Sequence, residues 1–185
     1  LAGKVVLVRC DLNVPVSDQG TVLEHDADRI RKALPTITYL KDAGAKVIII
    51  AHIGRDANET LRPVAAYMNI PLYPLMNFSK DTLNDHQVVL LENLRSNPGE
   101  EANDAAFAAH LAAYADIYVN DGFSVSHRAH ASVVGVPQLI PSYAGLQLVA
   151  EVESLKKVLQ PERPSLLIMG GAKFETKLPV IKKLL

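Results

Sequence analysis

Residues 4–9 read KVVLVR, a short run in which apolar and β-branched side chains follow one another with little polar interruption. Similar runs return at residues 46–50 (KVIII), 87–91 (QVVLL), 116–119 (DIYV) and 165–169 (SLLIM), with a weaker one, IPLYPL, at residues 70–75. Continuous apolar runs, unlike alternating ones, are typical of strands covered on both faces, as in a parallel sheet. We therefore expect a mainly parallel sheet of six strands.

Helical patterns lie between most of these runs. Apolar residues at helical spacing over residues 30–40 form a stripe that Gly44 would close, and Pro35 within it predicts a break with a second helix starting there. Asp104 can cap a helix over residues 105–115, and residues 146–159 form another amphipathic pattern. Alternating strands and helices with short connections predict an α/β fold, a three-layer α/β/α Rossmann-like domain over residues 1–185.

The composition sets limits on function. The chain has 185 residues, 49% hydrophobic, which suits one domain. Its 19 basic and 20 acidic residues leave a net charge of −1, so we expect neither a nucleic acid nor a membrane surface as partner. The single cysteine, Cys10, has no disulfide partner, which fits the cytoplasm. No signal peptide or apolar run of ~18 residues is present. Both ends of the sequence read as cuts in a longer protein.

Polar residues follow the expected strands. They are Asp11 and Asn13 after the first, His52, Gly54 and Arg55 after the second, Glu92, Asn93 and Arg95 after the run at residues 87–91, and Asn120, Asp121, His127, Arg128 and His130 after the run at residues 116–119. In a parallel sheet these residues meet beyond the carboxyl ends of the strands, where open α/β sheets bind ligands. Arginine forks bond carboxylate or phosphate oxygens in pairs, so the pattern indicates a small, multiply charged anion.

Other motifs leave alternatives open. Residues 170–173 (GGAK) fit backbone amides facing a phosphate at a helix N-terminus, or equally a tight strand-to-helix turn. They match neither GxxxxGK[ST] nor GxGxxG. His127 and His130 are three residues apart but lack a third ligand at metal-site spacing, so we expect no protein-bound metal. Ser124, Ser126 and Ser132 lie near these histidines, yet no GxSxG elbow supports a hydrolase.

Taken in order, VRCDLNVP, DADRIRKALPTI, AHIGR, LLENLR, VNDGFSVSHRAHAS and GGAKFETK resemble the N-terminal half of phosphoglycerate kinase. The resemblance implies reversible phosphoryl transfer between ATP and the carboxylate of 3-phosphoglycerate, giving 1,3-bisphosphoglycerate. The Mg²⁺ would be held by ATP or ADP and by a C-terminal domain that this chain lacks. The resemblance also implies that the chain is a monomer and does not turn over alone.

The resemblance assigns roles to individual residues. For 3-phosphoglycerate binding it implies Asp11, Asn13, Arg29, His52, Gly54, Arg55, Arg95 and Arg128. For this half's share of the nucleotide site it implies Gly171, Ala172, Lys173 and Lys177. For stabilising the transferring phosphoryl group it implies Arg29 and Lys177, with Lys173 on the nucleotide phosphates. No general base is implied, because the acceptor carboxylate is already ionised at neutral pH.

Some residues depart from the family pattern. Leu12, Ala51, Asp56 and Ser96 replace the usual phenylalanine, serine, proline and phenylalanine, and GFSVS and FETK are also altered. Asp56 would place a negative charge beside the anion site. The altered GFSVS and FETK segments leave open one alternative, an anion-binding regulatory protein without catalysis. An unrelated α/β enzyme acting on a sugar phosphate is another.

Overall fold

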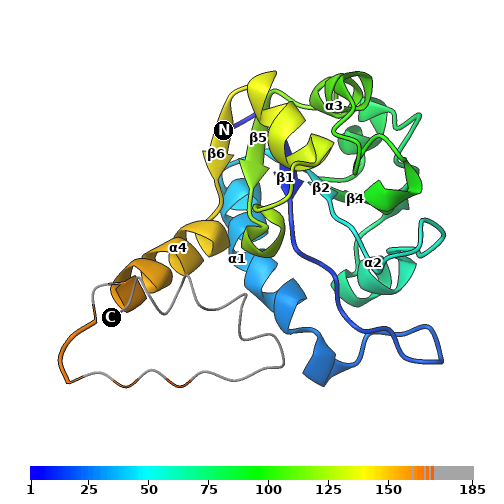
Figure 1. The fold of residues 1–185 in the computed structure, drawn as a ribbon. Coiled ribbons are helices and arrows are strands. Elements are labelled where there is room, and N and C mark those ends of the chain that lie inside the picture. Colours follow the sequence, from blue (N-terminus) through cyan, green and yellow to red (C-terminus); the bar gives the residue numbers. More distant parts are fainter. Residues whose placement is uncertain (160, 165, 167, 169–185) are drawn as a thin grey trace. The chain divides into compact units, whose positions relative to one another are not determined.

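The structure is a computed structural model that describes residues 1–159, 161–164, 166 and 168. The chain divides into two compact units, Leu1–Leu148 and Val149–Leu185. The sheet, drawn in Figure 1, and the polar residues that follow its strands belong to the first unit. Helix α4 (Leu146–Leu159) begins in the first unit and continues into the second.

The first unit is built on one sheet of six strands, paired in the order β3-β4-β2-β1-β5-β6. The strands are β1 (Val5–Arg9), β2 (Lys46–Ile50), β3 (Leu72–Tyr73), β4 (Val88–Leu91), β5 (Ile117–Asn120) and β6 (Ser142–Ala144). Every pair is parallel. The expected α/β fold with a parallel sheet is therefore confirmed.

The strand in the sixth position of the sheet is one that the sequence did not lead us to expect. The expected run at residues 165–169 lies mostly outside the described residues, and its described members Leu166 and Ile168 are exposed and in no strand. Strand β6 takes the sixth position beside β5. Its three residues, SYA, are all exposed at the edge of the sheet. Because an exposed edge strand need not be apolar, it has no apolar run by which the sequence could reveal it.

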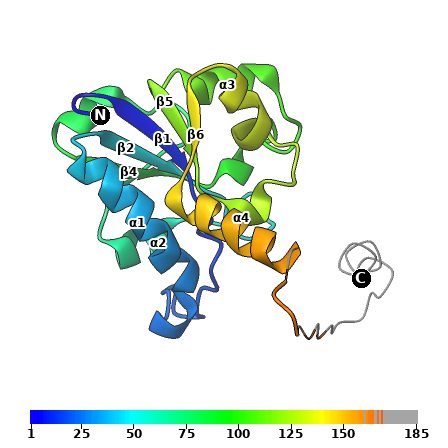
Figure 2. The same ribbon diagram turned by 90° about the vertical axis from the view of Figure 1, so that its left-hand side faces the viewer.

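Helices cover both faces of this sheet. Helices α1 (Asp28–Asp42) and α2 (Arg62–Met68) lie on one face, and α3 (Ala105–Ala112) lies on the other (Figure 2). Short 3-10 helices join the main elements: η1 (Glu24–Asp26), η2 (Lys80–Asn84), η3 (Leu94–Ser96), η4 (Phe123–Val125) and η6 (Val136–Gln138), with a π-helical turn, η5 (Ala131–Gly135), beside η6.

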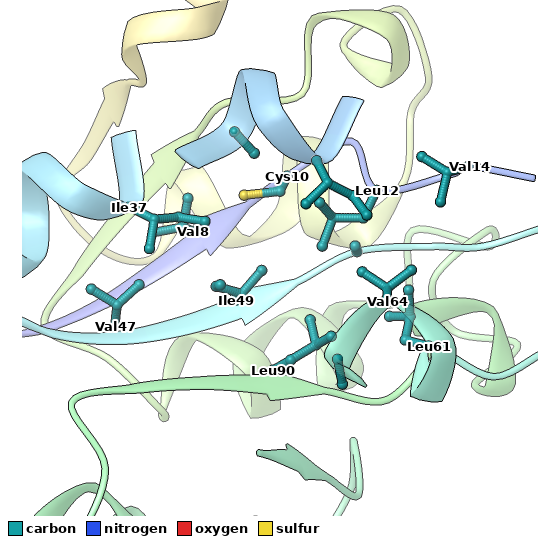
Figure 3. Packing of buried hydrophobic residues seen from close by; sticks show 14 of the residues in the cluster. Val8, Cys10, Leu12, Val14, Ile37, Val47, Ile49, Leu61, Val64 and Leu90 are labelled. Carbon is teal, nitrogen blue, oxygen red and sulfur yellow. The ribbon is translucent and has the colours of Figure 1, made fainter. Parts of the chain in front are cut away.

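Alternate side chains of the strands fill two separate cores. Val8, Val47 and Ile49 pack with Ile37 of α1 and Val64 of α2, as Figure 3 shows. The intervening strand residues face the other way, toward α3, in a cluster that includes Leu7, Ile48, Ile50, Phe107 and Leu111. A strand buried on both faces must be apolar at every position, which explains the continuous runs in the sequence.

Helix α1 shows one expectation confirmed and one wrong. Gly44 has φ of +80°, and Ala45 donates to the carbonyl of Leu40, which is the Schellman end expected at this glycine. The expected break at Pro35 does not occur, because α1 runs through it. Pro35 lies on the exposed face of the helix, where water can reach the carbonyl that proline leaves unbonded.

The other helix predictions agree better. Asp104 accepts from the amide of Phe107 at 2.8 Å and so caps α3, although α3 ends at Ala112, before the expected residue 115. The prediction for residues 146–159 matches α4. Among the described residues, no helix is long and apolar enough to cross a membrane.

Candidate functional site

The polar residues that follow β1, β2, β4 and β5 meet at one edge of the sheet, as the parallel arrangement requires. A cavity of about 540 Å³ there is lined by Asn13, His52, Gly54, Arg55, Arg95, Glu101 and Arg128. An adjoining cavity of about 440 Å³ shares Asn13 and Gly54 and adds Arg29 and Glu59. Between them, the two cavities are lined by every substrate residue that the resemblance implied except Asp11, which is paired with Arg29.

Asp11 holds Arg29, which lines the adjoining cavity. Its Oδ2 accepts from Nη1 of Arg29 at 2.7 Å and from the hydroxyl of Ser124 at 2.5 Å. Burial acts to raise the pKa of Asp11, but hydrogen bonds from Ser124 and Arg29 outweigh it and leave the pKa lowered. Asp11 is therefore an ionised carboxylate that directs a cation toward the site.

Asn13 connects the segment after β1 to the one after β2. Its Oδ1 accepts from the backbone amide of Gly54 at 2.8 Å. Gly54 has φ of +62°, a left-handed conformation that other residues rarely adopt. Both residues line both cavities, so the turn at Gly54 forms the wall between them.

His52 is held from behind by Arg9, a residue that the sequence reasoning did not place in the site. Nη2 of Arg9 lies 3.1 Å from Nδ1 of His52. A guanidinium can only donate, so Nδ1 accepts and the ring carries its proton on Nε2. Burial, together with the charges of Arg9 and Arg95, lowers the pKa of His52 to about 3. His52 is therefore neutral at physiological pH.

Arg9 is itself fully buried and satisfied by distant residues. Its Nε donates to Ser132 Oγ at 3.0 Å, and Ser132 donates its hydroxyl to Oε1 of the buried Glu100 at 2.6 Å. This network removes Ser132 from the candidate nucleophiles, because its hydroxyl lies between two buried charges. A charged residue at the end of an otherwise apolar strand was the sequence signal for Arg9.

The three arginines of the larger cavity differ in their partners. Arg95 donates through Nη1 to the carbonyl of Gly54, and its Nε lies 2.9 Å from Oε1 of Glu101. Glu101 is mostly exposed, so this pair is weak. Within the described part of the chain, neither Arg55 nor Arg128 has a carboxylate partner. Positive charge is thus in excess in this hollow.

Asn93 is a second residue whose role the sequence did not reveal. It is completely buried. Its Oδ1 accepts from the backbone amides of Ile53 at 3.3 Å and Arg95 at 3.1 Å. Its Nδ2 donates to the backbone carbonyls of Ile53 at 3.1 Å and Glu59 at 2.8 Å. One side chain therefore fixes the segments that carry Gly54, Arg55 and Arg95. The sequence placed Asn93 after a strand but gave it no partner.

The expected nucleotide residues cannot be placed. Gly171, Ala172, Lys173 and Lys177 lie outside the described residues. Within the described ranges there is also no group of three His, Cys, Asp or Glu side chains that could hold a metal ion.

Comparison with known proteins places this arrangement in a family. The phosphoglycerate kinase family profile matches residues 1–185. A phosphoglycerate kinase of Sinorhizobium medicae is 46% identical over 201 residues, covering 100% of this chain and 50% of the relative. One of Dictyoglomus turgidum is also 46% identical, with the same coverage.

Solved structures agree with the sequence comparison. Phosphoglycerate kinase from Coxiella burnetii superposes with a TM-score of 0.82 at 34% identity, over 98% of this chain and 49% of that one. The enzyme from Pyrococcus horikoshii gives a TM-score of 0.82 at 28% identity. The chain spans about half the length of the relatives it matches.

Proposed function

The chain belongs to the phosphoglycerate kinase family, and we propose that it is the half of such an enzyme that binds 3-phosphoglycerate. The observation that carries the proposal is the cavity of about 540 Å³, whose lining holds Arg55, Arg95 and Arg128 but only one carboxylate, Glu101. Three guanidinium groups around a small hollow suit a ligand with more than one negative charge.

The arrangement of the site gives each group a task in binding. Arg55, Arg95 and Arg128 would hold the phosphate end of the substrate. Neutral His52 would offer its Nε2–H as a further donor, because Arg9 occupies Nδ1. Asp11 and Asn13 would orient the hydroxyl and carboxylate end near Arg29. Each contact to the ligand is then made by a side chain whose direction the protein fixes in advance.

The reaction proposed for the complete enzyme needs no proton transfer from this site. An oxygen of the substrate carboxylate attacks the γ-phosphorus of ATP, the bond from that phosphorus to the bridging oxygen breaks, and ADP leaves with the electron pair. Bound Mg²⁺ would neutralise phosphate charge in this step. Arg29 from this half would stabilise charge on the transferring group, and we assign Lys177 and Lys173 to the same region by family resemblance.

The wider proposal follows from the same assignment. The second half of the relatives' length would supply the rest of the nucleotide site, so this chain should bind substrate without turning it over. We propose a cytoplasmic monomer that uses ATP or ADP with Mg²⁺. The anion-binding protein without catalysis remains the competing function.

Calorimetry on the 185-residue chain tests substrate binding. We expect 3-phosphoglycerate to bind without ATP, with an affinity that falls as salt is added, because the contacts are charge-assisted. Arg128→Ala should weaken binding by about 1.5–3 kcal/mol, the scale of a lost hydrogen bond to a charged group, and should leave the melting temperature nearly unchanged. No heat at millimolar 3-phosphoglycerate would refute the proposal, and intact affinity with a large loss of stability would make Arg128 structural.

A further inference from the structure

Glu59 lies against the turn that separates the two cavities. Its Oε1 accepts from the backbone amide of Arg55 at 2.8 Å and from that of Asp56 at 3.1 Å. The same carboxyl group covers Gly54 so closely that a Cβ built there would lie 1.8 Å from it. One side chain thus closes residues 54–59 into a loop. No role for Glu59 follows from the sequence motifs.

The backbone of Glu59 is anchored independently of its carboxylate. Its carbonyl accepts from the buried amide of Asn93 at 2.8 Å, and its own amide donates to the carbonyl of Asp56 at 3.2 Å. The carboxylate therefore starts from a fixed point and reaches back over four residues to the amide of Arg55. By contrast, the side chains from Arg55 to Thr60 are exposed, so no apolar packing holds the loop.

We infer that Glu59 is a positioning residue for the anion site: its carboxylate clamps the turn at Gly54 and Arg55, so that the loop presents Arg55 to the larger cavity before ligand arrives. This inference rests on the proposed function for the identity of the anion. Ordering a loop in advance raises affinity, because binding then costs less conformational entropy. Glu59 also adds a negative charge to the lining of the adjoining cavity, which Arg29 shares, and this charge disfavours anion binding. The gain in affinity from the ordered loop outweighs that effect.

Asp56 provides a matched control in the same loop. Its Oδ1 accepts from the amide of Asn58 at 2.8 Å and from the side chain of Asn58 at 2.9 Å, and it lines neither cavity. Replacing Asp56 removes a carboxylate from the loop without releasing Gly54 or Arg55. Charge and clamping can therefore be separated by comparing the two positions.

Titration of three variants with 3-phosphoglycerate and with inorganic phosphate tests the clamp. Glu59→Ala should weaken binding about five- to tenfold, since two hydrogen bonds to a charged acceptor are lost. Glu59→Gln keeps an oxygen acceptor and should stay within about twofold of the unsubstituted chain by the same reasoning. Asp56→Asn should bind equally well or more tightly. Equal or tighter binding by Glu59→Ala would overturn the inference, because it would show that only the charge matters.

Amide hydrogen exchange in the ligand-free chain makes a second test that does not need the substrate. Protection of the Arg55 and Asp56 amides should be lost in Glu59→Ala and kept in Asp56→Asn. Unchanged protection in Glu59→Ala would contradict the clamp even if 3-phosphoglycerate binds. Failure of the unsubstituted chain to bind 3-phosphoglycerate would instead refute the proposed function, and the exchange result would still decide whether Glu59 orders the loop.

Discussion

The buried Arg9 contacts the buried His52, which lines the anion cavity. Removing a guanidinium from water costs several kcal/mol unless charge and hydrogen bonds compensate it. Burial lowers the pKa of Arg9, and the negative charge of nearby Glu100 opposes that effect. The hydroxyl of Ser132 is hydrogen-bonded to both residues. Because Arg9 stays a donor, His52 is fixed in one tautomer. A neutral imidazole whose proton is fixed on Nε2 can donate a hydrogen bond to an anion without transferring a proton to or from it.

The neutral state of His52 makes stability depend on pH. Burial and the nearby arginines lower its pKa from 6.5 to about 3, so between these values the unfolded chain binds a proton that the folded chain does not. As the pH falls below 6.5, His52 should lower the free energy of unfolding by ~1.4 kcal/mol per pH unit. Urea unfolding between pH 7 and pH 5 should show that the free energy of unfolding falls less steeply with decreasing pH in His52→Gln than in the unsubstituted chain.

The comparison with His52→Gln is needed because another histidine acts in the same direction. Burial also lowers the pKa of His130, which is present in both proteins. The carboxylate of Asp11, whose pKa is also lowered, loses its contribution only at more acidic pH. Identical pH slopes in the two proteins would show that His52 is not held neutral by the fold.

The helices of the first unit end on local signals that agree with their packing. Gly44 ends α1 in a left-handed turn, and Asp104 begins α3 by accepting from the amide of Phe107. Phe107 lies in the first turn of α3 and is buried against the sheet. The cap therefore holds the end of the helix that carries a core aromatic residue.

Loss of the Asp104 cap should be measurable at the level of this one element. We expect Asp104→Ala to reduce the free energy of unfolding by ~1 kcal/mol, because an amide in the first turn loses its acceptor. Asp18→Ala is the control, since it removes an exposed aspartate outside any helix. The denaturation midpoints of the two variants and the unsubstituted chain are compared by denaturant titration. Equal midpoints for Asp104→Ala and the unsubstituted chain would count against the cap.

At the scale of the whole molecule, the site is assembled from segments far apart in sequence. Asp11 meets Ser124 across 113 positions, and Arg9 meets Ser132 across 123. Parallel strands make this possible because their carboxyl ends share one edge of the sheet. The chain spans about half the length of the relatives it matches. Under the proposed function, a second half would close over that edge and exclude water.

Lys177 is the residue whose role depends most on the completed molecule. In the enzyme joined to its second half, we expect Lys177→Ala to lower turnover about a hundredfold, or ~3 kcal/mol, while substrate affinities change little. A charge that acts mainly in the transition state affects turnover and catalytic efficiency together. Steady-state kinetics should show no such loss in Lys156→Ala, an exposed lysine of α4 paired with Glu153.

Two other kinetic outcomes would change the assignment of Lys177. Turnover within threefold of the unsubstituted enzyme would refute a catalytic role. A rise in the Michaelis constant for ATP alone would assign Lys177 to nucleotide binding instead.

The sequence by itself determined the layers, the parallel sheet and which polar residues meet at its edge. Strands buried on both faces must be apolar throughout, so β1, β2, β4 and β5 were readable from their continuous apolar runs alone. Residues that follow such strands share one edge by geometry, which was enough to bring together Arg55, Arg95, Arg128 and His52, whereas Arg29 was implied only by the family resemblance. Local caps at Gly44 and Asp104 depend only on neighbouring residues and were equally readable.

Only the tertiary structure decided what holds those residues in place. Edge strand β6 is exposed and has no apolar run, and Pro35 is tolerated because its face of α1 meets water. The partners of Arg9, the four bonds of Asn93 and the reach of Glu59 over Gly54 depend on distances between side chains. Periodicity reports which face of an element is buried, but a hydrogen bond requires two groups to meet within about 3 Å, and that is set by how the whole chain packs.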